Sequence, residues 1–317
     1  MKNIGTLKEF ACTPDRFQGG HRLCPGCAHS MIVREVVNAT DDDLVVSTAT
    51  GCLEVCTAIY PYTSWDVSWL HIGFENAAAA ISGAEAMYSA LSRKNRLYNE
   101  DRKVKFVAFG GDGGTYDIGF QSLSGAAERG HDFLYVCLDN ENYANTGGQR
   151  SSSTPIGAHT STTPRGRVSY GEKQRKKDLT MIMAAHGCPY VATAIPGTKH
   201  WKDLATKAAK AISTVGPTFI NALSPCTTEW KFKPEETVEI ADLAVETCAF
   251  PLYEIEDGHK LTITYRPKNK LPIEEYLSRQ GRFSHLFKPE NKWIIEEWQK
   301  NVDAYWEYLQ RREEAGV

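Results

Sequence analysis

The sequence predicts an α/β protein with a mainly parallel sheet flanked by helices, followed by a C-terminal arm built of helices and a hairpin. Three observations predict this fold. Short apolar runs typical of buried strands alternate with segments of helical periodicity as far as about residue 225. A glycine cluster, 110–114, directly follows one of these runs and precedes a helical segment, as in a strand–loop–helix unit. After Trp230 the alternation stops and aromatic helical segments replace it.

The first half of the chain opens with an irregular lead-in, residues 1–20, which contains Pro14 and two glycines. Apolar spacing and Ala content favour helices, and continuous β-branched or aromatic runs favour buried strands. The expected elements are helix 29–38, strand 44–48, strand 69–73, helix 75–91, strand 105–109, helix 117–128 and strand 133–138.

The second half opens with a long segment, 145–172, that is dense in Gly, Ser, Thr, Pro and Arg and lacks periodicity. Loops of this length inside a compact domain are usually functional or disordered. The expected elements after it are helix 179–185, strand 191–194, helix 201–214, strand 217–223, helix 235–248, a hairpin over 252–265 with an Asp-Gly turn, and helix 292–312. We therefore predict a domain over 1–230 that carries the site, and an arm over 231–317 that packs on the core or on a partner subunit.

Composition limits the class of protein. The 317 residues carry a formal net charge of −3, with 42% hydrophobic and 24% charged residues. This balance gives no electrostatic basis for binding nucleic acid or an anionic membrane. No apolar run approaches the length that spans a bilayer, and the first residues lack a signal-peptide pattern, so we expect a cytoplasmic protein. The nine cysteines are an odd number, which argues against a disulfide framework.

The most informative motif is Gly111-Asp112-Gly113, which 26 residues separate from Asn140. Glycines at the end of a strand allow a sharp turn and let phosphate oxygens approach the backbone. Asp112 and Asn140 supply the hard oxygen ligands that Mg²⁺ prefers, and the carbonyl of Asn142 is a third candidate. The motif therefore predicts a site for Mg²⁺ and a diphosphate at the carboxyl ends of two strands.

Two other interpretations of this motif are possible. Gly-Asp-Gly on its own is also a common turn, but the strand before it, the helix after it and Asn140 behind the next strand favour a site. A nucleotide phosphate loop is disfavoured, because the sequence has neither Gly-x-x-x-x-Gly-Lys-Ser/Thr nor Gly-x-Gly-x-x-Gly with an acidic ribose ligand.

Four cysteines stand next to turn residues. Cys24 and Cys27 enclose Pro-Gly, and Cys52 and Cys226 each follow an expected strand. Such knuckles suit a [4Fe–4S] cluster or a structural zinc, and the spacing does not separate the two metals. Five further cysteines are expected to be small buried residues: Cys12, Cys56, Cys137, Cys188 and Cys248.

Together these segments resemble the β subunit of the pyruvate:ferredoxin oxidoreductases and of their relatives, the 2-oxoacid:ferredoxin oxidoreductases, including the oxalate oxidoreductase branch. The stretches that carry the resemblance are Cys24-Pro-Gly-Cys-Ala-His-Ser, Ala49-Thr-Gly-Cys-Leu-Glu, Gly110-Gly-Asp-Gly-Gly-Thr-Tyr-Asp-Ile-Gly, Leu138-Asp-Asn-Glu-Asn-Tyr-Ala-Asn-Thr-Gly-Gly-Gln-Arg-Ser and Ser224-Pro-Cys. They stand in the family's order over about residues 15–230.

The resemblance implies a thiamine-diphosphate-binding fold and assigns the site residue by residue. It implies a [4Fe–4S] cluster on Cys24, Cys27, Cys52 and Cys226, in place of zinc. It implies Mg²⁺ on Asp112, Asn140 and the backbone oxygen of Asn142, and catalysis by Asn145, which faces the reacting carbonyl. Thiamine diphosphate is implied at the following positions: His29, Gly51, Cys52, Gly111, Asp112, Gly113, Gly114, Asn140, Glu141, Asn142, Tyr143, Ala144 and Asn145. His29 is otherwise read as a helix-capping or core histidine.

The resemblance also implies the reaction and the partners. A small 2-oxoacid, pyruvate by default, is decarboxylated oxidatively through thiamine diphosphate, and the electrons pass through the cluster to ferredoxin. Coenzyme A typically takes the acyl group; the oxalate branch forms carbon dioxide without it. The pyrimidine-activating glutamate is expected on an α subunit, with a subunit of two [4Fe–4S] clusters and a possible γ or δ subunit alongside. A zinc-stabilised binding protein and a thiamine enzyme without redox chemistry are the competing hypotheses.

Overall fold

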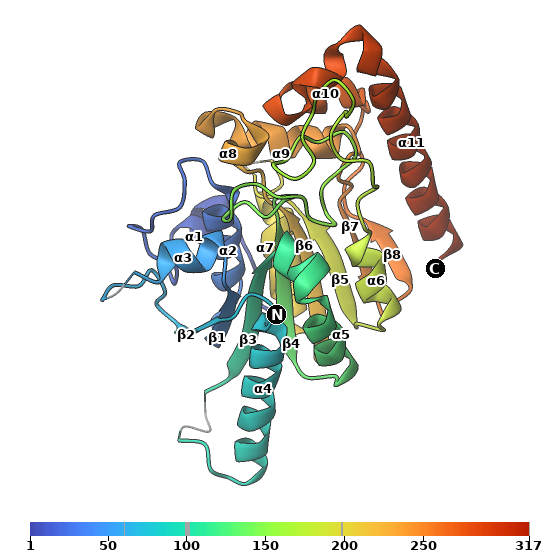
Figure 1. The fold of residues 1–317 in the computed structure, drawn as a ribbon. Helices are drawn as coiled ribbons and strands as arrows, with labels where there is room; N and C mark the ends of the chain where they lie inside the picture. The colour runs from blue at the N-terminus through green and yellow to red at the C-terminus, as the bar shows by residue number, and fades with distance from the viewer. Residues whose placement is uncertain (60, 99–101, 198, 317) are drawn as a thin grey trace.

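The structure is a computed structural model that describes residues 1–59, 61–98, 102–197 and 199–316. One eight-stranded sheet runs through it in the order β2-β1-β3-β4-β6-β5-β7-β8 (Figure 1). Pairing is parallel from β2 to β5, and the last two strands are antiparallel. The strands are β1 (Asp43–Ala49), β2 (Ser68–Ile72), β3 (Val104–Gly111), β4 (Phe133–Asp139), β5 (Tyr190–Ala194), β6 (Pro217–Leu223), β7 (Tyr253–Glu256) and β8 (Lys260–Ile263). The predicted mainly parallel α/β fold is confirmed.

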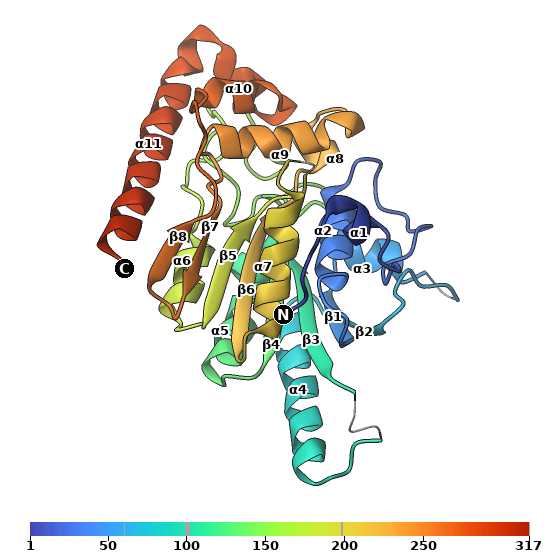
Figure 2. The ribbon, with the colours of Figure 1, turned by 180° about the vertical axis from the view of Figure 1, so that it is seen from behind.

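Helices cover both faces of the sheet. Helices α2 (Ala28–Val37) and α7 (Trp201–Ser213) pack on one face, and α4 (Ala77–Arg93), α5 (Phe120–Glu128) and α6 (Leu179–Ala185) pack on the other (Figures 1 and 2). Within β3, Val107 and Phe109 face α2 and α7, whereas Phe106 and Ala108 face the other layer. Strands buried on both faces read as continuous apolar runs, which is why the sequence located them.

Two short helices in the first 60 residues were not expected from the sequence. Helix α1 (Leu7–Ala11) lies in the lead-in that was predicted to be irregular. A capping box between Thr6 and Glu9 begins it, and Phe10 is buried with its ring centroid 5.8 Å from that of Trp201. Helix α3 (Cys52–Thr57) follows β1. Helices of one or two turns are too short to show periodicity, so the tertiary contacts decide them.

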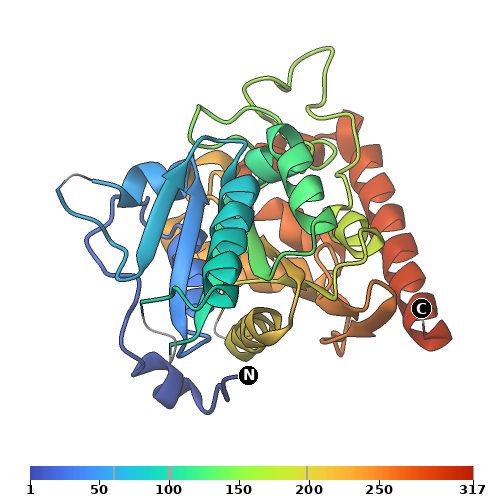
Figure 3. The ribbon, with the colours of Figure 1, turned by 90° about the horizontal axis from the view of Figure 1, so that it is seen from below.

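The chain beyond Trp230 continues the sheet and then covers its carboxyl edge. The predicted hairpin is confirmed: β7 and β8 pair through a turn in which Asp257 and Gly258 have φ of 52° and 75°. The remaining elements are α8 (Thr227–Trp230), η2 (Pro234–Glu236), α9 (Thr237–Glu246), α10 (Ile273–Ser278), η3 (Gly281–Phe287), η4 (Pro289–Asn291) and α11 (Lys292–Ala315). Helix α11 runs along the β8 end of the sheet, opposite the N-terminal segment (Figure 3). Since one sheet includes strands from both sides of residue 230, the division at that residue remains a prediction.

Within the described residues, no helix has the length and apolar character needed to cross a membrane.

Glu35 on α2 gives a prediction of pH-dependent stability. Burial raises the pKa of its carboxyl from 4.5 to about 8, although the charge of Arg34 lowers it, and Oε2 is buried without a hydrogen-bond partner among the described residues. The unfolded chain loses this proton first, so stability falls as the pH rises from about 4.5 to about 8. Glu35→Gln should therefore stabilise the protein by about 1–3 kcal/mol at pH 9 and not at pH 4.

Thermal unfolding at both pH values measures this difference. Glu307→Gln, at an exposed glutamate of α11, is the control and should change neither value. An equal shift of the Glu35→Gln variant at both pH values would contradict the assignment.

Candidate functional site

The carboxyl ends of β3 and β4 bring Asp112 and Asn140 together. The two strands pair in parallel, with Gly111 opposite Leu138, so the residues that follow them leave the sheet side by side. Asp112 is completely buried, and its Oδ1 accepts a hydrogen bond from the backbone N–H of Asn140 at 3.3 Å. The 26-residue separation in sequence is thus closed by strand pairing.

Two oxygens and the side-chain amide of Asn140 converge at this point. One terminal atom of this amide lies 2.6 Å from the carbonyl oxygen of Asn142 and 2.9 Å from Asp112 Oδ1. Without a cation, hydrogen bonding places the amide nitrogen there, where it donates to both acceptors. With a cation between them, the amide would turn over and present its oxygen. Oxygens about 2.1 Å from one Mg²⁺ in an octahedron stand about 3 Å apart, which is the spacing found here. The geometry therefore fits a hard cation held by a carboxylate, an amide and a carbonyl.

The electrostatics of Asp112 also favour a bound cation. Burial, and next the charge of Asp139, raise the pKa of Asp112 well above its ordinary value, against the lowering effect of a hydrogen bond from Ser151 and the charge of Lys176. Two buried carboxylates this close repel each other unless a cation offsets them. Ser151 Oγ donates to Asp112 Oδ2 at 2.5 Å, which leaves Oδ1 to face Asn140.

The loop after β3 is shaped by glycines. A Cβ on Gly113 would lie 2.6 Å from the ring of Tyr143, whereas a Cβ on Gly111 would meet no atom of the described residues within 4 Å. The helix was expected to begin at residue 117, but helical structure begins directly after Asp112, as the π-helical turn η1 (Gly113–Ile118). Gly119 closes that turn, since its N–H donates to the carbonyl of Gly114 at 2.8 Å. The result is a tight backbone turn beside open space, as a phosphate-binding loop requires.

The segment 141–145 divides into buried and exposed parts. Glu141 is buried, and its carboxylate is engaged by Lys176 and Arg282, away from the three converging groups. Tyr143 donates from Oη to Asp117 at 3.1 Å. Ala144 is half-buried, and Asn145 is exposed at the tip of the turn. The predicted cofactor residues 140–145 thus lie on one continuous loop, in which Asn145 is exposed.

The four predicted cluster cysteines lie near one another at the starts of three helices: Cys24 and Cys27 before α2, Cys52 at the start of α3, and Cys226 before α8. Burial raises the pKa of Cys27 to about 12, and the charges of Cys226, Cys24 and Cys56 add to the rise. Burial also raises the pKa of Cys52, followed by the charges of the same neighbours and Cys27. Helix α8 contacts this group, because Thr228 Oγ1 lies 3.8 Å from Cys24 Sγ. Thiols whose charges raise one another's pKa lie near one another, so these four remain candidates for one metal centre.

Across the described ranges, no three His, Cys, Asp or Glu side chains are arranged to hold a single metal ion. A [4Fe–4S] cube binds each cysteine through a different iron, so its thiols surround the cube and do not meet at one ion. Mg²⁺ in turn commonly takes one or two carboxylates and completes its shell with phosphate and water oxygens.

Two of the five remaining cysteines are not where the sequence placed them. Cys137, Cys188 and Cys248 are buried as expected. Cys12 is exposed, and Cys56 is half-buried beside the cluster thiols, so the prediction of small core residues is wrong for both. Cys56 lies one helical turn after Cys52 on α3, a helix that was not anticipated, and this turn carries it to the same side.

His29 connects the thiol group to the oxygen site. It lies two residues after Cys27 at the start of α2, and its Nε2 is 3.5 Å from Asn140 Nδ2. Burial lowers the pKa of His29 to about 4, so the ring is neutral at pH 7. Its Nδ1 is buried and has no hydrogen-bond partner within the described part of the chain. The predicted cluster and metal residues therefore adjoin.

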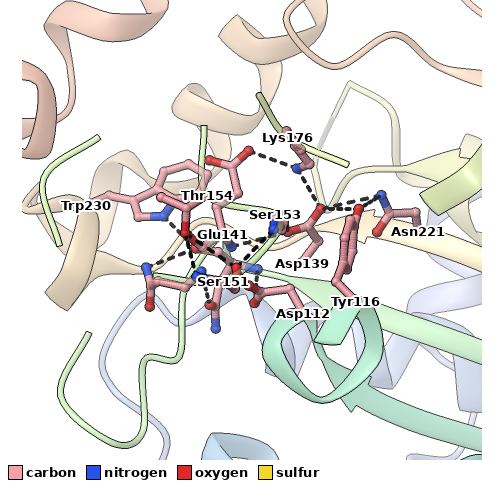
Figure 4. Close-up of polar contacts among 12 residues, drawn as sticks. Asp112, Tyr116, Asp139, Glu141, Ser151, Ser153, Thr154, Lys176, Asn221 and Trp230 are labelled. Carbon is pink, nitrogen blue, oxygen red and sulfur yellow. Dashed lines mark hydrogen bonds and ion pairs between the residues drawn. The ribbon is translucent and has the colours of Figure 1, made fainter. Parts of the chain in front are cut away.

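A buried polar network supports the oxygen site from behind (Figure 4). Lys176 Nζ lies 2.6 Å from Asp139 Oδ2 and 3.0 Å from Glu141 Oε1. Thr154 Oγ1 donates to the carbonyl of Glu141 at 2.7 Å, and Ser153 Oγ donates to Asp139. Glu141 was predicted as a cofactor residue, but Ser153, Thr154 and Lys176 were not; the density of Ser and Thr in the long loop was the one available signal, and nothing in the sequence marked Lys176 or Arg282.

Comparison with known proteins identifies the family. The thiamine pyrophosphate enzyme, C-terminal TPP binding domain family matches residues 49–222. The pyruvate synthase subunit PorB of Methanocaldococcus jannaschii is 53% identical over 287 residues, which cover 90% of this chain and 94% of that protein. The ketoisovalerate oxidoreductase subunit VorB of Pyrococcus furiosus is 42% identical over 90% of this chain and 92% of its own.

One solved structure shares the fold. A chain of the 2-oxoglutarate:ferredoxin oxidoreductase from Magnetococcus marinus superposes with a TM-score of 0.58 over 88% of this chain and 93% of that chain, at 23% identity. The family match and the identity over nine-tenths of the chain establish the family that the motifs indicated. The chain belongs to the thiamine-pyrophosphate-binding β subunits of the pyruvate:ferredoxin oxidoreductase family.

Proposed function

We propose that this chain is the thiamine-diphosphate and iron–sulfur subunit of a pyruvate:ferredoxin oxidoreductase, with the site residues assigned as follows. The observation that carries the proposal is the convergence of Asp112 Oδ1, the Asn142 carbonyl oxygen and the Asn140 side-chain amide within 2.6–2.9 Å contacts, where the amide would turn its oxygen to a bound cation. These oxygens hold Mg²⁺, and Gly111 to Gly114 receive the diphosphate against the backbone.

The other residues orient the cofactor. Bound thiamine diphosphate supplies the carbanion that attacks a 2-oxo carbon and the electron sink for decarboxylation. With the Asn140 oxygen on the metal, its amide nitrogen faces His29 Nε2 at 3.5 Å, which makes Nε2 the acceptor and leaves the His29 proton on Nδ1 for the cofactor. Tyr143 packs against Gly113 and fixes the loop, while the exposed Asn145 donates to the developing oxyanion of a substrate. Gly51 and Cys52 line the edge contributed by β1.

Cys24, Cys27, Cys52 and Cys226 bind a [4Fe–4S] cluster next to this site. Their mutual charge repulsion is relieved by cationic iron, and the exposure of Cys24 brings the cluster to the protein surface. A surface cluster suits electron transfer to a further subunit of two [4Fe–4S] clusters and then to ferredoxin. Membership of an enzyme family removes the support for a zinc-stabilised binding protein.

The family that matches this chain is the C-terminal thiamine-pyrophosphate-binding domain. We therefore assign the pyrimidine-activating glutamate, which belongs to the pyrimidine-binding domain, to an α subunit. A γ or δ subunit completes the assembly, which we place in the cytoplasm. Pyruvate is favoured as substrate by the 53% identity to a pyruvate synthase subunit, with coenzyme A as acyl acceptor. A branched 2-oxoacid is the second candidate, because VorB is 42% identical.

An anaerobic assay of the co-purified complex tests the substrate. Pyruvate, 2-oxoisovalerate, 2-oxoglutarate and oxalate are each offered with and without coenzyme A, and the reduction of a low-potential dye is followed. We expect pyruvate with coenzyme A to exceed the other substrates in kcat/KM by about 10-fold or more. Turnover of oxalate without coenzyme A, at a rate above that of pyruvate, would place the chain in the oxalate branch.

A further inference from the structure

The residue between the two amide ligands has an unusual backbone. Glu141 lies between Asn140 and Asn142 and has a φ of 63°, in the left-handed region that few residues other than glycine occupy. This reversal brings the side chain of Asn140 to within 2.6 Å of the carbonyl of Asn142, a contact that an extended chain would not make. The metal geometry therefore depends on whatever holds Glu141 in this conformation.

Buried cations hold the Glu141 side chain. Arg282 from η3 lies 2.5 Å from Glu141 Oε2, and Lys176 lies 3.0 Å from Oε1. Although burial would raise the pKa of Glu141, the charges of Lys176 and Arg282 together hold it below the ordinary value. Arg282 is 2% exposed and Glu141 is 5% exposed, so this ion pair is shielded from water and sensitive to the loss of either partner.

Arg282 also supports the residue before Glu141. Its guanidinium lies over the indole of Trp230, 3.9 Å from the ring centroid, and the Trp230 Nε1–H donates to the carbonyl of Asn140 at 2.8 Å. Trp230 is completely buried and ends helix α8, whose N-cap is Cys226. One arginine from the C-terminal segment thus braces both Glu141 and Asn140, through a helix that begins at a cluster cysteine.

We propose that Arg282, acting through Glu141 and Trp230, is a positioning residue that pre-organises the Mg²⁺ loop, and we call these three residues the loop clamp. This inference rests on the proposed metal site. Arg282 touches neither the metal nor the substrate; it fixes the backbone that presents two of the three oxygens. Without the clamp the loop samples other conformations, and the apparent metal affinity falls by the fraction of molecules that remain competent.

The test measures Mg²⁺ affinity directly. Mg²⁺ is titrated calorimetrically into the purified complex with saturating thiamine diphosphate, for Arg282→Met, Trp230→Phe, Arg282→Lys and the parent protein. We expect Arg282→Met and Trp230→Phe to raise the apparent Kd by about 10-fold to 100-fold, as the loss of outer-shell partners of metal ligands does. Arg282→Lys, which keeps a charge for Glu141 but not the flat stacking group, should lie between them and the parent.

Two features separate positioning from a general structural role. Thiamine diphosphate occupancy of Arg282→Met should return to the parental level at high Mg²⁺, because a pre-organisation defect is overcome by mass action. Arg279→Met is the matched control, since Arg279 lies three residues away and pairs at the surface with Glu239; its Kd should be unchanged. A double-mutant cycle with Glu141→Gln should show that the effects of Arg282→Met and Glu141→Gln are not additive.

Each outcome has a defined meaning. If Arg282→Met folds with a lowered Tm but binds Mg²⁺ with the parental Kd, the clamp proposal is wrong. If Arg282→Met does not assemble, Trp230→Phe decides, because it removes the N–H that bonds the Asn140 carbonyl and keeps a smaller aromatic ring for the Arg282 guanidinium. If Asp112→Asn binds Mg²⁺ normally, the metal site is wrong and not merely the clamp.

Discussion

Asp112→Asn should abolish the retention of Mg²⁺ and thiamine diphosphate. Asp112 is the one carboxylate among the three converging groups, and the neutral amide removes the charge that attracts the cation. We expect Mg²⁺-dependent thiamine diphosphate binding to weaken on the order of 100-fold or more, beyond the effect of an outer-shell change. Calorimetry with each component, and the cofactor content after gel filtration, measure the loss.

The same substitution should leave the protein folded. Asp112 and Asp139 are both completely buried, so the removal of one charge relieves repulsion in the cofactor-free protein and its Tm should not fall. Asp178→Asn is the matched control, because Asp178 is a half-buried carboxylate that caps α6, and asparagine also caps helices. Full cofactor occupancy in Asp112→Asn would refute the metal assignment.

Cys27→Ala should eliminate the iron–sulfur cluster. Cys27 is the second thiol of the Cys-Pro-Gly-Cys knuckle and immediately precedes α2; burial, and next the charges of Cys226, Cys24 and Cys56, raise its pKa. Loss of one of four ligands removes the cube, so we expect iron and acid-labile sulfide to fall from about four per site to near zero. The anaerobic complex should also lose the part of its broad visible absorption, bleached by dithionite, that comes from this subunit's cluster.

Cys56 provides the sharper comparison. Cys56 is half-buried beside the same thiols, and its charge helps to raise the pKa of Cys27 and of Cys52. It is nevertheless not among the proposed ligands. Cys56→Ala should keep the full iron content, as should Cys12→Ala at an exposed position. Iron loss in Cys56→Ala, together with retention in Cys52→Ala, would replace Cys52 by Cys56 in the ligand set.

Much of the fold followed from local pattern. The central parallel strands are buried on both faces, so each reads as an apolar run. The Asp257-Gly258 turn predicts the hairpin of β7 and β8. The helices of one or two turns, α1 and α3, left no periodicity to detect. The wrong prediction for Cys56 follows from the missed helix α3. Without that helix, the sequence does not show that Cys56 lies on the same face as Cys52.

The sequence by itself determined the chemistry: which oxygens and thiols the chain carries, that they follow strands, and which family they indicate. The tertiary structure decided how those groups are held. Parallel pairing of β3 with β4 sets Asp112 beside Asn140. Lys176 and Arg282 reach Glu141 from 35 and 141 residues away. A motif records only residues that are near one another in the chain, whereas a buried charge is stabilised by whichever partner the fold brings to it, and the sequence carries no local mark of that partner.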